Sequence, residues 1–188
     1  MNDLRHLQDL QARFLAGEKL SFTPFWGHQP GKHGVTASCF SQWYAAPFVV
    51  DGVSYPTAEH FMMAEKAAMF GDEDARRDIL AAPSPNEAKA IGRRVKGFDE
   101  VRWLERRFDI VTRANLAKFE QHAELRSFLL STGDSVLVEA SPVDRVWGIG
   151  LAQADAASND PRMWRGLNLL GFALMRVRDC LTGCRDSV

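Results

Sequence analysis

The sequence predicts an α+β fold, a single and predominantly helical domain with a few short strands. Apolar residues recur at helical spacing through most of the chain, several times behind a good N-cap, whereas only two short stretches have strand composition. The length of 188 residues suits one core, and no Pro/Ser linker, internal repeat or low-complexity tract divides the chain. We therefore expect one domain.

The first third of the chain predicts a helix, an irregular region and a hairpin. Residues 3–16 have the spacing of an amphipathic helix, which could serve as a peripheral lid, and a region rich in Gly and Pro follows to about residue 38. Residues 48–55 predict a hairpin, because Asp51-Gly52 lies between β-branched and aromatic residues. Thr57 then suits the N-cap of the next helix.

The middle of the chain predicts two capped helices. Ser84, Pro85 and Glu87 combine an N-cap, a proline at the first helical position and an acid at the third, which predicts a helix to about Arg94. Asp99 can cap a long helix to about Glu120. Its expected buried stripe consists of Val101, Leu104, Phe108, Val111 and Leu116.

The last third predicts two helices around one strand. Residues 122–131 predict a short helix and residues 135–139 a strand. Asp160-Pro161 predicts the start of a final helix. Its expected apolar residues are Trp164, Leu167, Leu170, Leu174 and Val177.

Composition limits the functional classes. A formal net charge of −1, from 23 basic and 24 acidic residues, argues against a strongly basic nucleic-acid scaffold. The sequence has no run of 18 apolar residues and no leader pattern, so we expect a cytoplasmic protein. Three cysteines, at 39, 180 and 184, suit a reducing compartment. His28 and His33 share one loop, but no second cluster of metal ligands accompanies them, and we expect no metal.

The stretch from Pro56 to Lys66 places an acid and a base on one face of a predicted helix. Positions seven apart nearly eclipse and lie about 10.5 Å apart along the axis, so Glu59 and Lys66 share a stripe. Side chains lean toward the helix N-terminus, so the gap between the two head groups could hold a small polar substrate. Glu59 falls in the first turn, where backbone N–H groups favour an ionised carboxylate.

An ordinary solvated helix face is the alternative interpretation of the same spacing. The surrounding residues His60, Phe61, Met63 and Ala64 leave little surface for solvent. A mostly apolar helix with two charges on one stripe favours a partly buried pair, which needs partners or a ligand.

A second group of candidate residues follows the predicted strand at 135–139. Asp144, Trp147, Gly148 and Gly150 lie in one segment, in which glycines allow close approach of a ligand and the indole offers a stacking face. The alternative is a core tryptophan beside a glycine turn. The segment is no dinucleotide fingerprint, because the third glycine and the strand-turn-helix context are missing.

Five motifs in this order resemble those of the NADAR (YbiA-like) family. They are Pro56-Thr57-Ala58-Glu59-His60, Lys66, Lys118-Phe119-Glu120-Gln121-His122, Trp147-Gly148-x-Gly150 and Asn168-x-x-Gly171. The resemblance covers residues 21–181, which leaves 1–20 as a helical extension before a domain at 21–188. It implies an N-glycosidase that separates a base from ribose phosphate or ADP-ribose, either in riboflavin-pathway intermediates or in ADP-ribosylated guanine of nucleic acid.

The resemblance also implies site residues. Glu59, Lys66 and Asp144 are the expected catalytic residues. The expected substrate-binding residues are Trp103, Trp147, Gly148, Asn168, Arg93 and Arg165. The chain departs from the enterobacterial riboflavin-type members, which have Asp after Trp-Gly where this chain has Ile149.

Hydrolysis of an N-glycosidic bond passes through a cationic sugar, so a carboxylate such as Glu59 can stabilise it or orient water. Lys66 could pair with a phosphate, support Glu59 or attack C1 of the sugar to form an imine. No cofactor or metal is expected. A binding module for ADP-ribose or an NAD derivative that does not cleave it, and a helical interaction protein, are the alternatives.

Overall fold

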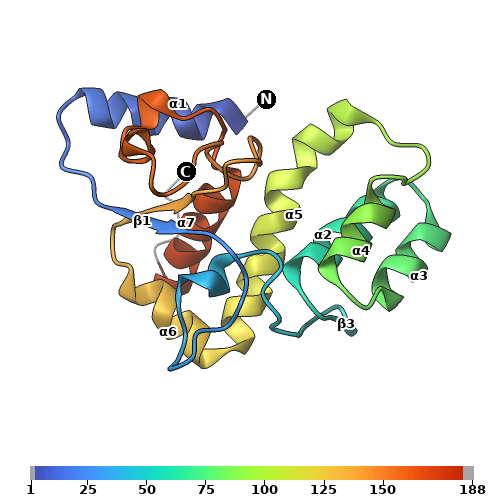
Figure 1. The fold of residues 1–188 in the computed structure, drawn as a ribbon. Helices are drawn as coiled ribbons and strands as arrows, with labels where there is room; N and C mark the ends of the chain where they lie inside the picture. The colour runs from blue at the N-terminus through green and yellow to red at the C-terminus, as the bar shows by residue number, and fades with distance from the viewer. Residues whose placement is uncertain (1–2, 184–188) are drawn as a thin grey trace. The chain divides into compact units, whose positions relative to one another are not determined.

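The computed structural model describes residues 3–183 (Figure 1). Within this range the chain forms seven α-helices, three short 3-10 helices and four short strands, which confirms the predicted α+β, mainly helical class. The described residues cluster into two compact units. The first unit comprises residues 3–41 and 124–183, and the second comprises residues 42–123. Cys184 lies outside the described residues.

The first unit is built on two parallel strands and the helix that covers them. β1 (Phe22–Phe25) pairs with β4 (Val136–Glu139), with Phe22 opposite Val136 and Phe25 opposite Glu139. α7 (Leu169–Thr182) packs against β4, which is buried over its first three residues. The remaining elements are η1 (Ala37–Phe40), α6 (Ala123–Ser131), η2 (Ala156–Asn159) and η3 (Pro161–Met163).

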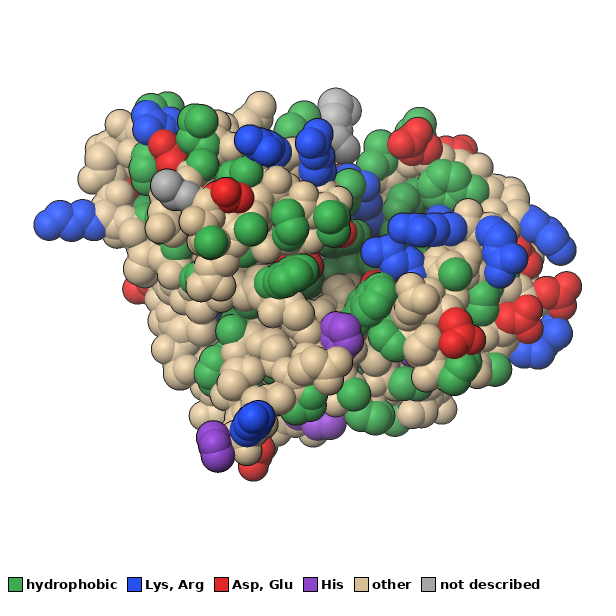
Figure 2. Space-filling model, viewed as in Figure 1, with side chains coloured by type: hydrophobic (Ala, Val, Ile, Leu, Met, Phe, Trp, Pro, Cys, Tyr) green, Lys and Arg blue, Asp and Glu red, His purple; other side chains and the backbone are tan. Residues whose placement is uncertain are grey.

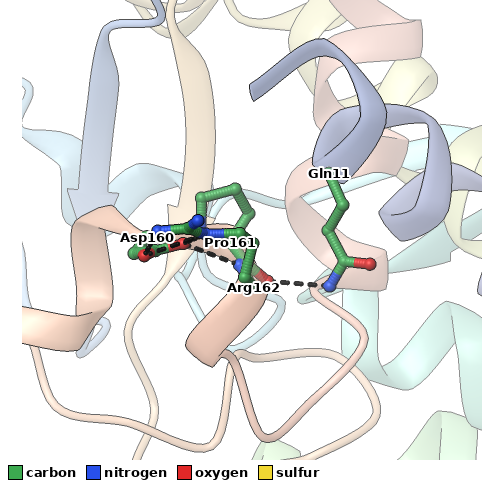
Figure 3. A network of polar contacts seen from close by, with 4 residues as sticks. All are labelled: Gln11, Asp160, Pro161 and Arg162. Atoms are coloured by element: carbon green, nitrogen blue, oxygen red, sulfur yellow. Dashed lines mark hydrogen bonds and ion pairs between the residues drawn. The ribbon is translucent and has the colours of Figure 1, made fainter. Parts of the chain in front are cut away.

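The N-terminal helix α1 (Asp3–Leu15) packs onto the first unit at two places. Its Leu7 and Leu10 are buried, and His6 stacks on Phe172 of α7 with ring centroids 5.4 Å apart. Gln11 Nε2 donates a hydrogen bond of 2.9 Å to the Pro161 carbonyl at η3 (Figure 3).

Arg162 adds a second contact between η3 and α1. The Arg162 guanidinium pairs with the Asp160 carboxylate, as Figure 3 shows, and lies 5.2 Å from the ring of Phe14. α1 is therefore anchored to the segment that leads to Trp164 and Arg165. Its assignment to a separate extension at 1–20 stays a prediction.

The second unit is a hairpin followed by four helices. β2 (Phe48–Val50) and β3 (Val53–Tyr55) pair antiparallel around Asp51 and Gly52, whose φ angles of 51° and 77° are those of the expected tight turn. The four helices are α2 (Ala58–Met69), α3 (Glu73–Ala81), α4 (Pro85–Gly92) and α5 (Glu100–Gln121). α2 packs against the other three, and every residue from Ala58 to Ala64 is buried.

The Lys118–His122 motif fixes the hairpin to the end of α5. Gln121 Oε1 accepts from the Val49 N–H at 2.9 Å, and Gln121 Nε2 donates to the Val49 carbonyl at 2.8 Å. His122 Nε2 donates to the Pro47 carbonyl at 2.8 Å. The Gln121 side-chain amide thus makes the two backbone hydrogen bonds to Val49 that a neighbouring strand would otherwise make.

The predicted helix from residue 160 is wrong in its first part. Residues 161–163 form only the short η3, and the regular helix α7 starts at Leu169. Asn168 has a left-handed backbone, with φ 55° and ψ 33°, which a continuous helix does not allow. Trp164 and Leu167 therefore lie outside the helix to which their spacing assigned them.

Among the described α-helices and strands, two were not predicted. β1 lies inside the region expected to be irregular, and α3 has only one buried apolar residue, Ile79, so its apolar periodicity is weak. The helices near residues 3–16, 85–94, 99–120 and 122–131, the hairpin and the strand near 135–139 are confirmed.

Candidate functional site

The first turn of α2 holds Glu59 in a buried position. The Thr57 hydroxyl oxygen accepts from the His60 N–H, which confirms Thr57 as the N-cap, and Glu59 is only 2% exposed. The Glu59 N–H donates to the Gln42 carbonyl at 3.0 Å. The backbone on both sides of Glu59 is thus fixed, and its side chain is buried rather than on a solvated helix face.

His60 secures the same turn from the other side. Its Nε2 lies 3.1 Å from the Ala82 carbonyl oxygen and its Nδ1 lies 2.8 Å from the Thr57 hydroxyl. A carbonyl oxygen only accepts, so Nε2 carries the proton and Thr57 donates to Nδ1. Burial lowers the pKa of His60, which favours this neutral ring.

Lys66, near the other end of α2, is held between a carbonyl and two aromatic rings. Its Nζ donates to the Gly92 carbonyl at 2.8 Å and lies 4.2 Å from the ring centroid of Phe98 and 5.6 Å from that of Trp103. Burial lowers the pKa of the Lys66 amine. The structure therefore brings together two predicted site residues, Lys66 and Trp103.

The Gly92 carbonyl can take this position because residue 92 has no side chain. A Cβ on Gly92 would lie 2.1 Å from Met63 Sδ, so α4 ends in direct contact with α2. Arg93 follows as the C-cap residue of α4 and is exposed. Figure 2 shows Lys and Arg side chains gathered on the visible face of the second unit around α4 (compare Figure 1).

Phe98 was not among the predicted residues. It is 46% exposed and packs edge-on against Phe70 at 5.4 Å. It precedes the Asp99 cap in a short connection, where a single aromatic residue gives no periodic signal. Only the fold shows that its ring covers the Lys66 amine.

In the first unit, the Asp144 carboxylate shapes the loop that carries Trp147. Oδ1 of Asp144 accepts from the backbone N–H groups of Val146 and Trp147, at 2.8 Å each. The Asp144 N–H donates to Ser141 Oγ at 3.2 Å. Trp147 is half-buried. It is therefore neither a wholly buried core residue nor a fully exposed one.

A second segment pairs with this loop backbone to backbone. The N–H groups of residues 165, 167, 168, 169 and 170 donate to the carbonyls of residues 149, 145, 148, 146 and 147 respectively, at 2.8–3.2 Å. Close approach requires glycine, because a Cβ on Gly166 would lie 2.3 Å from the Gly148 carbonyl oxygen. Arg165 is exposed at the start of this pairing, while Gly148 is buried.

Asn168 connects the paired segments to β4. Its Nδ2 donates to the Leu137 carbonyl and its Oδ1 accepts from the Glu139 N–H, at 2.9 Å each. The residue is fully buried, with 0% exposure. Its side-chain amide is thus bonded on both sides to the strand, an arrangement that favours holding the loop over direct binding of substrate.

Among residues 3–183 no group of three or more His, Cys, Asp or Glu side chains lies close enough to hold a metal ion. No helix in that range is both long and apolar enough to span a membrane.

Comparison with known proteins decides the family. The model of the NADAR domain matches residues 24–182. The chain belongs to the NADAR family. This one match includes residues of both compact units, as expected for a single domain.

Three relatives support the NADAR assignment. The chain is 40% identical over 157 residues to N-glycosidase R617 of Acanthamoeba polyphaga mimivirus, covering 81% of this chain and 92% of the relative. It is 37% identical over 142 residues to N-glycosidase YbiA of Escherichia coli, covering 76% and 80%. The third, the maize Riboflavin biosynthesis protein PYRR, chloroplastic, is 40% identical over 140 residues, which is 71% of this chain but 21% of that protein.

The fold of this NADAR chain also matches a solved structure. The NMR structure of E. coli YbiA superposes with a TM-score of 0.70, at 32% sequence identity and 89% coverage of both chains.

Proposed function

We propose that this chain hydrolyses the N-glycosidic bond between a nitrogenous base and a ribose phosphate or an ADP-ribose moiety. The observation that carries the proposal is the buried Glu59 in the first turn of α2, in a NADAR-family chain whose relatives R617 and YbiA are named N-glycosidases. The chain is accordingly an enzyme, a hydrolase acting on N-glycosyl bonds. Riboflavin-pathway intermediates and ADP-ribosylated guanine are the two substrate classes we propose.

Glu59 is the residue to which we assign the central step. As the bond between C1 and the base nitrogen breaks, its electrons leave with the base, and positive charge develops on C1 and the ring oxygen. A carboxylate held in a water-poor position stabilises that charge strongly. Water adds to C1, and its proton passes to Glu59 or to the departing nitrogen.

Lys66 is assigned to the support of negative charge, either a substrate phosphate or the Glu59 carboxylate. Attack of its amine on C1 is the second possibility, and it requires an amine that is neutral near pH 7. The lowered pKa of Lys66 acts in that direction. The Gly92 carbonyl and the Phe98 ring hold Nζ in one place, which suits either role.

The other predicted residues have supporting roles in the proposal. Trp147 or Trp103 stacks on the base, and Arg93 or Arg165 binds phosphate. Asp144 acts as a second carboxylate and, through Oδ1, keeps the Trp147 loop in shape.

Gly148 and Asn168 support the same loop. Gly148 allows the backbone to approach closely, since a Cβ there would lie 2.9 Å from the Glu139 carbonyl oxygen. Asn168 positions this loop against β4 rather than touching the substrate.

A panel of substrates tests the proposal. The protein is incubated with ADP-ribosylated guanosine, with riboflavin-pathway ribose phosphates and with NAD, and free base and free sugar phosphate are measured by mass spectrometry. Release of equal amounts of base and sugar supports hydrolysis. Tight binding without release would instead identify a binding module for ADP-ribose.

A further inference from the structure

The stems of two arginines meet at Gly150 in the first unit. A Cβ placed on Gly150 would lie 3.0 Å from Arg165 Cβ and 3.2 Å from Arg145 Cγ. We propose that Arg145 and Arg165 form a two-arginine clamp for the phosphoryl groups of the substrate. The clamp rests on the proposed function and names a further binding residue, Arg145, for it.

Backbone pairing holds the two arginines beside each other. The Leu167 N–H donates to the Arg145 carbonyl at 3.0 Å, and the Arg165 N–H donates to the Ile149 carbonyl at 2.8 Å. Gly166 lies so close that a Cβ there would be 2.7 Å from Arg145 Cα. The two side chains therefore start from a backbone that hydrogen bonds hold in place, and the guanidinium ends can adapt to a ligand.

Within the described part of the chain, the charges of the pair are not neutralised. Across residues 3–183, neither guanidinium makes an ion pair or a hydrogen bond to a side chain or a carbonyl, and both residues are exposed. Arg162 and Arg113 differ, since each of them pairs with a carboxylate. The neighbouring Asp144 directs Oδ1 to backbone N–H groups.

Two guanidiniums on neighbouring stems are suited to phosphate. Each can donate two parallel hydrogen bonds to one phosphoryl group, and their shared positive charge is relieved by an anion between them. A diphosphate such as that of ADP-ribose can use both side chains, whereas a single phosphate uses them only in part. Trp147 lies two residues after Arg145 and offers a ring face for the base.

The test is a titration with defined probes. Binding of ADP-ribose, ribose 5-phosphate and inorganic pyrophosphate is measured by calorimetry for the wild type, Arg145→Gln, Arg165→Gln and the double variant. Arg5→Gln is the matched control, because Arg5 is an exposed arginine on α1 and its loss changes the net charge equally. Arg145→Lys keeps the charge without the planar fork.

We expect each glutamine substitution to weaken ADP-ribose binding by about 10-fold or more, and the double variant to weaken it further, since each loses a charge-assisted pair of hydrogen bonds. Ribose 5-phosphate should be affected less, Arg145→Lys should be intermediate, and Arg5→Gln should bind like the wild type. Raised salt should reduce wild-type affinity more than that of the double variant.

Three results would overturn the clamp: unchanged binding in both single variants, equal weakening by Arg5→Gln, or no wild-type binding of any probe. Failure of the proposed hydrolysis is seen separately, because the titrations need no turnover. If the wild type binds ADP-ribose through both arginines but releases no base from any substrate of the panel, the clamp stands and the proposed hydrolase activity is contradicted.

Discussion

The amine of Lys66 donates to the Gly92 carbonyl at 2.8 Å, which joins the last turn of α2 to the end of α4. Phe98 and Trp103 cover the same amine, at 4.2 and 5.6 Å from their ring centroids. A lysine that only solubilised a helix face would extend into water. This one is fixed at a defined place, beside two aromatic rings.

Lys66→Met should keep the fold and lower hydrolysis by about 100-fold or more, because the apolar part of the side chain remains and the positive head group is lost. Turnover is measured on the best substrate of the panel, with Lys19→Met, at an exposed position, as the control. Borohydride added during wild-type turnover, followed by mass measurement, decides covalency. A trapped sugar on Lys66 indicates an imine, and its absence assigns the residue to charge support.

Asn168→Ala should destabilise the protein by about 2–4 kcal/mol. The substitution removes two buried hydrogen bonds to β4, leaves two backbone groups unsatisfied and places alanine in a left-handed conformation. The free energy of unfolding is measured with urea. Asn159→Ala, at an exposed position, should change it by less than about 0.5 kcal/mol. Equal stability of the two variants would contradict the bracing role of Asn168.

Gln11→Ala should cost about 1 kcal/mol of stability, because it removes the hydrogen bond from α1 to the Pro161 carbonyl. Gln8→Ala is the matched control on the exposed face of the same helix and should be nearly neutral. Thermal unfolding of both variants is compared with that of the wild type. If the two substitutions have the same effect, the anchor shown in Figure 3 contributes nothing.

His60 should make the protein less stable as the pH falls below 6.5. Burial lowers its pKa in the folded state, so between that value and 6.5 the unfolded chain binds more protons than the folded chain. Stability therefore rises with pH across this window, by about 1.4 kcal/mol for each unit of lowering. His60→Gln should flatten this dependence in urea titrations at several pH values. An unchanged slope would assign the pH dependence to other groups.

The sequence predicted the elements whose signals are local. Thr57, Ser84 and Asp99 are recognisable N-caps, and each caps the helix expected of it. Asp51-Gly52 likewise forms the turn expected of it. The family resemblance also pointed to Lys66 and Trp103, which the fold brings together.

The features that were missed depend on distant partners. β1 is a strand because β4, more than 110 residues later in the chain, pairs with it in parallel. The last helix starts late because Asn168 is bonded to β4 and residues 165–170 pair with the Trp147 loop. Arg145 and Arg165 lie close together because of the same pairing, and their spacing along the chain does not reveal this.

The proposed hydrolysis depends most on Glu59, and comparison of Glu59→Gln with the wild type tests this role most directly. Glu65→Gln is the control on the same helix, since Glu65 is a half-buried acid paired with Arg113. Released base is followed by mass spectrometry on a substrate that the wild type cleaves, with folding verified by circular dichroism. We predict a loss of about 100-fold or more for Glu59→Gln and less than about threefold for Glu65→Gln. Wild-type turnover in a folded Glu59→Gln variant would contradict the account.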